Sequence, residues 1–221
     1  MKDENLEQKA NFMNKVTFSS SNVKVNLDYI GEIEKSLKNY TLASSNFKVT
    51  ELGECGEPPY GLALAASGDS KICVYLKLNR IWGWKPTPID ATDITKAGKT
   101  WDEDFVRHWQ AQDNKNFVWI SCKTVKKRDV IKDDSEKKDD REKIDKFEYF
   151  PRNRGIDLKF FPFTKTEDVQ PPPLVAVMIT PNSRFEEETS VEIECRAYHK
   201  GKLAMIHICL SISASSSRCC P

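Results

Sequence analysis

Short stretches in which hydrophobic residues recur at every second position lie along this chain from residue 72 onward. In Ile72–Arg80 the apolar residues alternate with Lys77 and Asn79, a period of two that predicts a half-buried strand. Leu174–Ile179 is apolar throughout, which is typical of a strand buried on both faces. The predicted strands are Ile72–Arg80, Phe117–Cys122, Leu174–Ile179, Val191–Tyr198 and Leu203–Ile212.

A different repeat precedes these strands. Between residues 30 and 40, apolar side chains recur at steps of three, four and three residues, which places them on one face of a short helix. Asp28 precedes the repeat and is expected to be its N-cap. One further helical turn is predicted around Asp102–Gln110. The apolar positions of the first helix are Ile30, Ile33, Leu37 and Tyr40.

Three segments have no hydrophobic repeat. Residues 1–24 are predicted to be a disordered tail or linker, and residues 213–221 to be a tail rich in Ser and Cys. Lys123–Lys146 interleaves charges of both signs, which predicts a solvated loop. Residues 25–212 are expected to form a single domain. Its predicted fold class is mainly β, an immunoglobulin-like antiparallel β-sandwich with long irregular loops and one short N-terminal helix.

Composition limits the partners of this domain. Lys and Arg number 34 against 33 Asp and Glu, for a formal charge of +1, so no overall field attracts nucleic acid or an anionic membrane. No apolar run approaches the ~20 residues of a membrane-spanning helix. The polar N-terminus also lacks the apolar core of a signal peptide. We therefore expect partners to be recognised by a local surface, with no nucleic acid among them.

The sequence contains no recognisable catalytic motif. It has no GxSxG elbow, no glycine-rich phosphate loop and no HExxH. His108, His199 and His207 are too scattered for metal-ligand spacing, and we expect His108 to be a packed or surface residue. The sequence therefore predicts a binding protein, with no catalytic residue, metal, cofactor or small-molecule substrate.

The sequence contains seven cysteines, and their use indicates the cellular compartment in which the chain folds. None of the first four forms a CxxC pair, so they are interpreted as buried free thiols or as disulfides. Asn39-Tyr40-Thr41 is an N-glycosylation sequon, which matters only in the secretory pathway. Together these features favour an oxidising, extracellular environment. The cysteines are Cys55, Cys73, Cys122, Cys195, Cys209, Cys219 and Cys220.

Five segments, in chain order, resemble motifs of one family. In the longest, Lys71–Pro86, a cysteine precedes a hydrophobic stretch, Lys-Leu-Asn-Arg, a Gly between two Trp residues and a Pro. This segment resembles the signature strand of the β subunit of the sodium/potassium-transporting ATPase. Together with the predicted helix, the matching segments cover residues from about 28 to 198. Their sequences are most similar to the invertebrate branch of the family. The other segments are Leu52–Cys55, Phe147–Phe150, Phe160–Phe163 and Val191–Tyr198.

The resemblance implies a pattern of disulfides. The family's third disulfide is missing as a whole, because Ser45 stands where its second cysteine is expected and no cysteine precedes Cys55. After Tyr198 the sequence departs from the family, so the last three cysteines have no counterpart there. The implied pairs are Cys55–Cys73 and Cys122–Cys195.

Members of this family are non-catalytic subunits of a P-type cation pump. The resemblance implies a domain on the extracellular face of the plasma membrane that assists the folding, membrane delivery and potassium affinity of the catalytic α subunit. It also implies a glycoprotein, with Asn39 as the glycosylated residue. The family's cytoplasmic tail and membrane helix have no match in this sequence, so membrane association is expected only through such a missing helix or through α. Since disulfides do not persist in the cytosol, we expect the N-terminus to be incomplete.

The resemblance also indicates a surface for the α subunit. The aromatic segment Phe160–Phe163 matches the region that the family uses against α, with phenylalanines where the family has tyrosines. Ordinary core packing of the same rings is the alternative interpretation. The candidate α-binding residues are Tyr149, Phe150, Phe160, Phe161, Pro162 and Phe163.

Two other functions compete with the pump subunit. One is a soluble extracellular immunoglobulin-like adhesion or binding module that derives from the β-subunit fold and acts independently of the pump. The other is a fragment without function. Both stay open because the membrane segment is missing and the C-terminal sequence is unlike that of the family.

Overall fold

The computed structural model of this chain describes residues 15–18, 23–42, 47–62, 71–78, 81–98, 101–125, 144–164, 171–181, 190–200 and 202–212. Strands make up most of its regular structure. The strands are β1 (Lys15–Phe18), β2 (Ile72–Lys77), β3 (Phe117–Thr124), β4 (Ile144–Phe150), β5 (Gly155–Asp157), β6 (Leu174–Pro181), β7 (Ser190–His199) and β8 (Lys202–Ile212). The helices are α1 (Val23–Leu42), α2 (Ala91–Ala97) and α3 (Glu103–Ala111), with 3₁₀ segments η1 (Val49–Gly56) and η4 (Leu158–Phe160).

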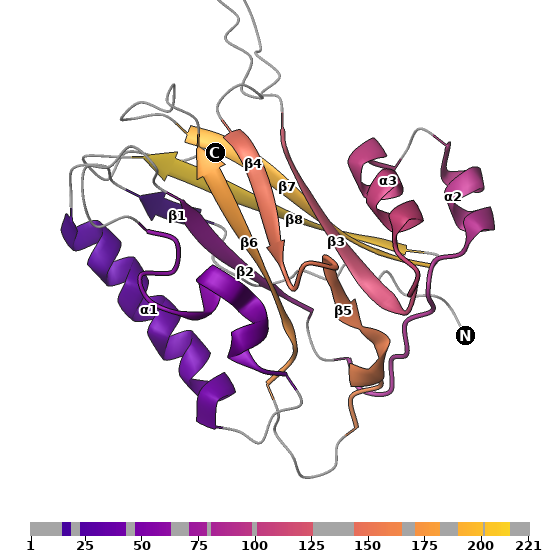
Figure 1. The fold of residues 1–221 in the computed structure, drawn as a ribbon, viewed down its shortest axis with the longest axis horizontal. Helices are drawn as coiled ribbons and strands as arrows, with labels where there is room; N and C mark the ends of the chain where they lie inside the picture. Colours follow the sequence, from indigo (N-terminus) through magenta and orange to yellow (C-terminus); the bar gives the residue numbers. More distant parts are fainter. Residues whose placement is uncertain are drawn as a thin grey trace, which may run out of the picture.

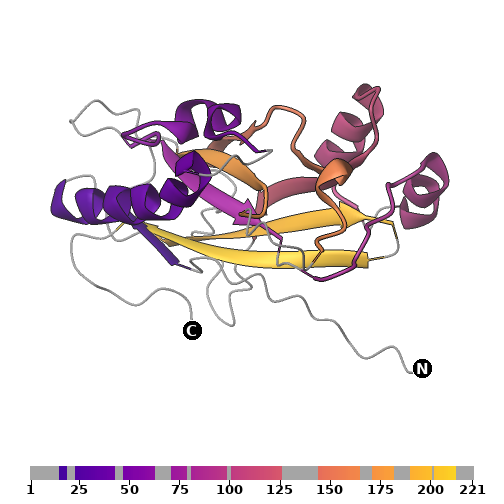
Figure 2. The same cartoon turned by 90° about the horizontal axis from the view of Figure 1, so that it is seen from below.

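The strands form two open sheets. One has five strands in the order β1-β8-β7-β3-β5, and the other has three in the order β2-β6-β4. Every pairing is antiparallel except that of β1 with β8, which is parallel. The smaller sheet lies over one face of the larger one, as the two views in Figures 1 and 2 show. The prediction of a mainly β fold is confirmed, while the immunoglobulin-like arrangement stays a prediction.

The main hydrophobic core contains buried residues of both sheets. The first six residues of β6, Leu174–Ile179, are all buried, as the uninterrupted apolar run predicted. Strand β7 has the predicted alternation, because its inward residues from Val191 to Ala197 are at most 1% exposed. In β2, the apolar residues Ile72, Val74 and Leu76 are buried as predicted.

Helix α1 lies at one end of the molecule, beside β1 and η1 (Figure 1). Its predicted apolar face, from Ile30 to Tyr40, is buried. The hydroxyl of Tyr29 also donates a hydrogen bond of 2.7 Å to the carbonyl oxygen of Cys73 in β2. Two expectations about this helix were wrong. It has 20 residues and is not short, and Asp28 lies inside it instead of capping it.

A second, smaller core lies at the other end, where α2 and α3 pack near the ends of β3 and β7 (Figure 1). Phe105 of α3 stacks on Tyr198 of β7 with ring centroids 4.0 Å apart. Asp102 caps α3 by accepting hydrogen bonds from the amides of Asp104 and Phe105. Only one turn of α3 was predicted from the sequence, and α2 was not predicted. The residues of this core are Ile89, Phe105, Trp109, Phe117, Trp119 and Tyr198.

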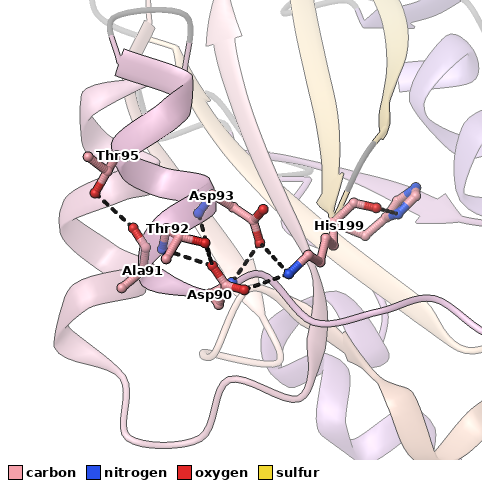
Figure 3. A network of polar contacts seen from close by, with 7 residues as sticks. Asp90, Ala91, Thr92, Asp93, Thr95 and His199 are labelled. Atoms are coloured by element: carbon pink, nitrogen blue, oxygen red, sulfur yellow. Dashed lines mark hydrogen bonds and ion pairs between the residues drawn. The ribbon is translucent and has the colours of Figure 1, made fainter.

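Asp90 ties α2 to the end of strand β7 (Figure 3). Its carboxylate accepts hydrogen bonds from the amides of Thr92 and Asp93, at 2.8 and 2.9 Å, which caps the helix. The Lys200 ammonium lies 2.6 Å from the same carboxylate and 3.7 Å from that of Asp93. Hydrogen bonding from Lys200 is the main reason why the pKa of Asp90 lies well below its usual value.

Strands β4 and β5 were not predicted. The predicted loop Lys123–Lys146 loses its two ends to β3 and β4, and residues 126–143 lie outside the described part. The predicted tail 1–24 contains β1 and the first residues of α1, whereas residues 1–14, 19–22 and 213–221 lie outside the described part. The division into one domain and two tails stays a prediction. Among the described helices, none combines the length and apolar character needed to cross a membrane.

Candidate functional site

Two disulfides are formed, and they match the pairs implied by the resemblance. Cys55 of η1 is joined to Cys73 of β2, with Cα atoms 5.7 Å apart. Cys122 of β3 is joined to Cys195 of β7, its direct neighbour in the same sheet, with a Cα separation of 4.0 Å. All four side chains are buried. The second bridge therefore crosslinks neighbouring strands within one sheet, unlike the bridge between sheets of an antibody domain.

Tyr149 and Phe150 lie at the end of β4, and both are buried. The Tyr149 hydroxyl accepts a hydrogen bond of 2.8 Å from the amide of Cys122, and burial raises the pKa of this phenol. The Phe150 ring lies so close to Gly53 that a Cβ on the glycine would be 2.5 Å from it. Both side chains thus have core positions, and neither forms part of an exposed surface.

The segment from Phe160 to Phe163 divides between core and surface. Phe161 is 7% exposed and packs edge-on against Trp84, with ring centroids 5.3 Å apart. Phe160 is half-buried and lies 6.5 Å from the ring of Phe47. Pro162 is exposed and Phe163 is half-buried, 5.1 Å from the ring of Phe161. The part of this segment that reaches the surface is therefore Phe160, Pro162 and Phe163.

Residues 82–84 support this surface from the side. Trp82 and Phe163 form a parallel β-bridge, and the Gly83 amide donates a hydrogen bond of 2.9 Å to the carbonyl oxygen of Phe163. Trp84 packs edge-on between Phe161 and His199, at 5.3 Å from each ring. Trp82 itself is 51% exposed. The Trp-Gly-Trp segment is part of the resemblance in sequence, but Trp82 was not among the predicted site residues.

Asn39 lies in the last turn of α1, where its side chain and that of Thr41 are exposed. Tyr40, between them, is buried and donates a hydrogen bond of 2.8 Å to the carbonyl oxygen of Pro172. The sequon therefore has its acceptor residue and its threonine on the solvent side, and its middle residue fixes the helix to the entrance of β6.

Two of the hollows lined by described residues lie near the predicted site, and neither suggests chemistry. One, of about 550 Å³, is an open groove between α1 and η1 lined by both charged and apolar residues. The other, of about 110 Å³, lies beside Phe160 and is lined by Glu51, Asp157 and Lys159 among apolar residues. No group of three or more His, Cys, Asp or Glu in the described residues is placed to hold a metal ion.

His108 is packed, as expected. Its Nε2 atom lies 3.2 Å from the carbonyl oxygen of Asn153, and its ring meets that of Trp119 edge-on at 5.8 Å. Burial is the main cause that lowers the pKa of this imidazole. Its contacts are therefore those of a residue that holds α3 against the larger sheet.

Comparison with known proteins gives one family. The family model described as "Sodium / potassium ATPase beta chain" matches residues 4–205. The subunit beta-2 of the sodium/potassium-transporting ATPase from Drosophila melanogaster is 28% identical over 131 residues, which are 57% of this chain and 35% of that protein. The beta-2 subunit of Oryctolagus cuniculus is 28% identical over 177 residues, or 76% of this chain and 44% of that protein. The chain thus spans less than half the length of the curated relatives it matches.

Proposed function

The chain belongs to the sodium/potassium ATPase β-chain family, and on this premise we propose that it is the extracellular domain of a non-catalytic pump subunit. In this role it binds a catalytic α subunit at the extracellular face of the plasma membrane. It assists the folding and membrane delivery of α and adjusts the affinity of the pump for potassium. The observation that carries the proposal is the family match over residues 4–205, which includes both disulfides and the whole aromatic segment.

The proposed contact with α is the exposed part of the aromatic segment. Pro162 is exposed and Phe160 and Phe163 are half-buried, so all three are accessible to a partner, and aromatic residues are enriched at protein interfaces. Phe161 lies beneath this surface, because it is buried and its ring packs on that of Phe163, whereas Tyr149 and Phe150 are core residues of β4. None of the three touches a partner directly, because a partner does not reach buried rings without opening the fold, and Phe161 acts by positioning the segment.

We also propose that the two sheets are the layers of an immunoglobulin-like sandwich. Residues of both sheets share one buried core, which fits two packed layers. The disulfide within the larger sheet, and helices at both ends of the molecule, distinguish it from an antibody domain. A comparison of its strand connections with those of an experimental structure of the chain tests this assignment.

Co-expression with a catalytic α subunit tests the function. The tagged protein is produced with α in an animal cell line, captured from detergent-solubilised membranes and probed for α. We expect α in the captured fraction, more α at the cell surface than without the chain, and a changed potassium dependence of ATPase activity. If the chain is secreted or captured without α, the pump role is wrong and an independent binding module takes its place.

Two variants sharpen this test. Phe163→Ala removes a ring of the proposed contact, and we expect it to weaken capture of α. Leu27→Ala removes an exposed apolar side chain of α1 that lies outside the proposed contact, where Leu27 is 53% exposed. Equal capture of α by the two variants would place the contact elsewhere on the chain.

A further inference from the structure

Trp82 is an unusual surface residue in this chain. Among the side chains that the structure describes, the exposed large apolar ones are Leu27 and Trp82, at 53% and 51%. A single exposed apolar residue is common on soluble proteins, whereas a cluster of them marks a contact site. Trp82 does not stand alone, because its backbone is paired with that of Phe163 and Pro162 beside it is exposed. Trp82, Pro162 and Phe163 are called the Trp82 patch below.

The backbone that carries Trp82 is fixed. The Trp84 amide donates a hydrogen bond of 3.2 Å to the Ile81 carbonyl oxygen, which closes a tight turn. Gly83, within this turn, has a φ of 73°, a left-handed conformation that glycine adopts without strain. The Gly83 amide donates a hydrogen bond to the carbonyl oxygen of Phe163, and the ring of Trp84 packs between the rings of Phe161 and His199. A partner therefore meets Trp82 in a position that is already ordered, which lowers the entropic cost of binding.

We propose that Trp82 is a contact residue for the α subunit, and that α presents an apolar side chain together with a carbonyl group to the Trp82 patch. The apolar side chain would pack on the indole, proline and phenylalanine surfaces. The carbonyl oxygen would accept a hydrogen bond from the indole N–H, which has no acceptor among the described residues, because tryptophan combines a large apolar face with one donor. This inference rests on the proposed function and extends its contact surface from residues 160–163 to the turn at residues 81–84.

A protein loop fits the patch better than a lipid surface does. Insertion into a membrane interface requires several apolar side chains that enter the headgroup region together. Here Trp82 is the one large apolar side chain of the patch that is half exposed, while Phe163 is half-buried and lies against Phe161. Tryptophans in such ordered, partly enclosed positions dominate the binding energy of many protein interfaces.

Capture of α by single variants tests the inference. Trp82→Ala, Trp82→Phe, Phe163→Ala and Leu27→Ala are each co-expressed with α, and the affinity for α is measured in detergent. We expect Trp82→Ala to weaken binding at least about tenfold, with only a small loss of thermal stability because the side chain is half exposed. Trp82→Phe should recover part of this loss, since it keeps an apolar ring but lacks the donor. Leu27→Ala should bind as the unchanged chain does.

The outcomes separate the inference from the function on which it rests. If Phe163→Ala weakens binding and Trp82→Ala does not, the role of Trp82 is wrong and the proposed function stands. If the unchanged chain does not bind α at all, the proposed function fails, and this inference with it. If Trp82→Ala leaves binding to α unchanged but abolishes binding to vesicles of phosphatidylcholine and phosphatidylserine, the patch is a lipid contact and the inference is overturned.

Discussion

The hydroxyl of Tyr149 in β4 accepts the backbone N–H of Cys122 in β3 at 2.8 Å, and so joins the two sheets at the disulfide. Cys122 lies opposite Cys195 with a Cα separation of 4.0 Å, which identifies a pair whose amides point away from each other. The Cys122 amide therefore points to the β5 side of β3. On this side the Ile120 amide donates a hydrogen bond to the carbonyl oxygen of Arg154. Two residues further along β3, where no described strand pairs with it on this side, the Tyr149 hydroxyl is the acceptor for the Cys122 amide.

Tyr149→Phe tests this relationship. The substitution keeps the ring but leaves the Cys122 amide buried without its acceptor, so we expect the free energy of unfolding to fall by about 1–3 kcal/mol. Denaturant unfolding measures the loss, and hydrogen exchange should become faster at the Cys122 amide. An unchanged unfolding midpoint would mean that the bond contributes nothing to stability.

The two disulfides should differ in their contribution to stability. Their sequence separations are 18 and 73 residues, and the chain-entropy relation gives about 3 and about 4 kcal/mol for loops of these lengths. We therefore expect the double variant Cys122→Ser/Cys195→Ser to lose more stability than Cys55→Ser/Cys73→Ser. Unfolding under non-reducing conditions measures both. The reverse order would show that loop length does not govern these bridges.

Substitutions at Phe161 and Trp82 should differ in their effect on stability, because Phe161 is a core residue and Trp82 a surface residue. Phe161 is buried against Trp84, so Phe161→Ala is expected to lower the free energy of unfolding by about 3–5 kcal/mol. Trp82→Ala removes a side chain that is half in solvent, and its effect on unfolding should be much smaller. Thermal unfolding of the two variants measures the contrast, and an equal loss from both would mean that Trp82 is part of the core.

Acid should weaken the attachment of α3 through His108. Its pKa in the folded chain is lowered, mainly by burial, whereas in the unfolded chain it is about 6.5. Between these two values the unfolded state binds more protons, so stability is complete above pH 6.5 and falls as the pH is lowered. His108→Gln removes this contribution. We expect its unfolding free energy to change less between pH 7 and 5 than that of the unchanged chain, and parallel curves would contradict the prediction.

Asn39 should carry an N-linked glycan when the chain passes through the secretory pathway. Asn39 and Thr41 are exposed, so a glycan does not disturb the packing of Tyr40. We expect a mobility shift on treatment with peptide-N-glycosidase, lost in Asn39→Gln and Thr41→Ala. Thr41→Ser is the matched control, because it keeps the sequon and should keep the shift. A chain without any shift would contradict the prediction.

The sequence predicted strands where burial leaves a regular alternation of apolar and polar residues or an uninterrupted apolar run. The regular alternation in β7 follows from its buried residues Val191, Ile193, Cys195 and Ala197. Strand β4 was missed because its pairing with β6 has an irregularity between Ile144 and Lys146, which breaks the period of two. Strand β5 has three residues, too few for any period to appear.

The candidate surface was predicted only in part. The family motif indicated the rings of residues 160–163 as one segment, but their division into core and surface depends on how the chain folds around Trp84. Trp82 and Trp84 flank the same glycine, and sequence alone treats them alike. The turn at Gly83 leaves Trp82 51% exposed and packs Trp84 between Phe161 and His199.

The spacing of the bridges has a consequence for the order of events during synthesis. Cys55 meets its partner after 18 residues, whereas Cys122 waits for 73, which at a ribosomal rate of 5–20 residues per second is about 4–15 s. During this interval the Cys122 thiol is available for a wrong partner. If Cys55–Cys73 closes early, the two cysteines that precede Cys122 in the chain are no longer available to it, and the first bridge then protects the second from mispairing while the nascent chain is still growing.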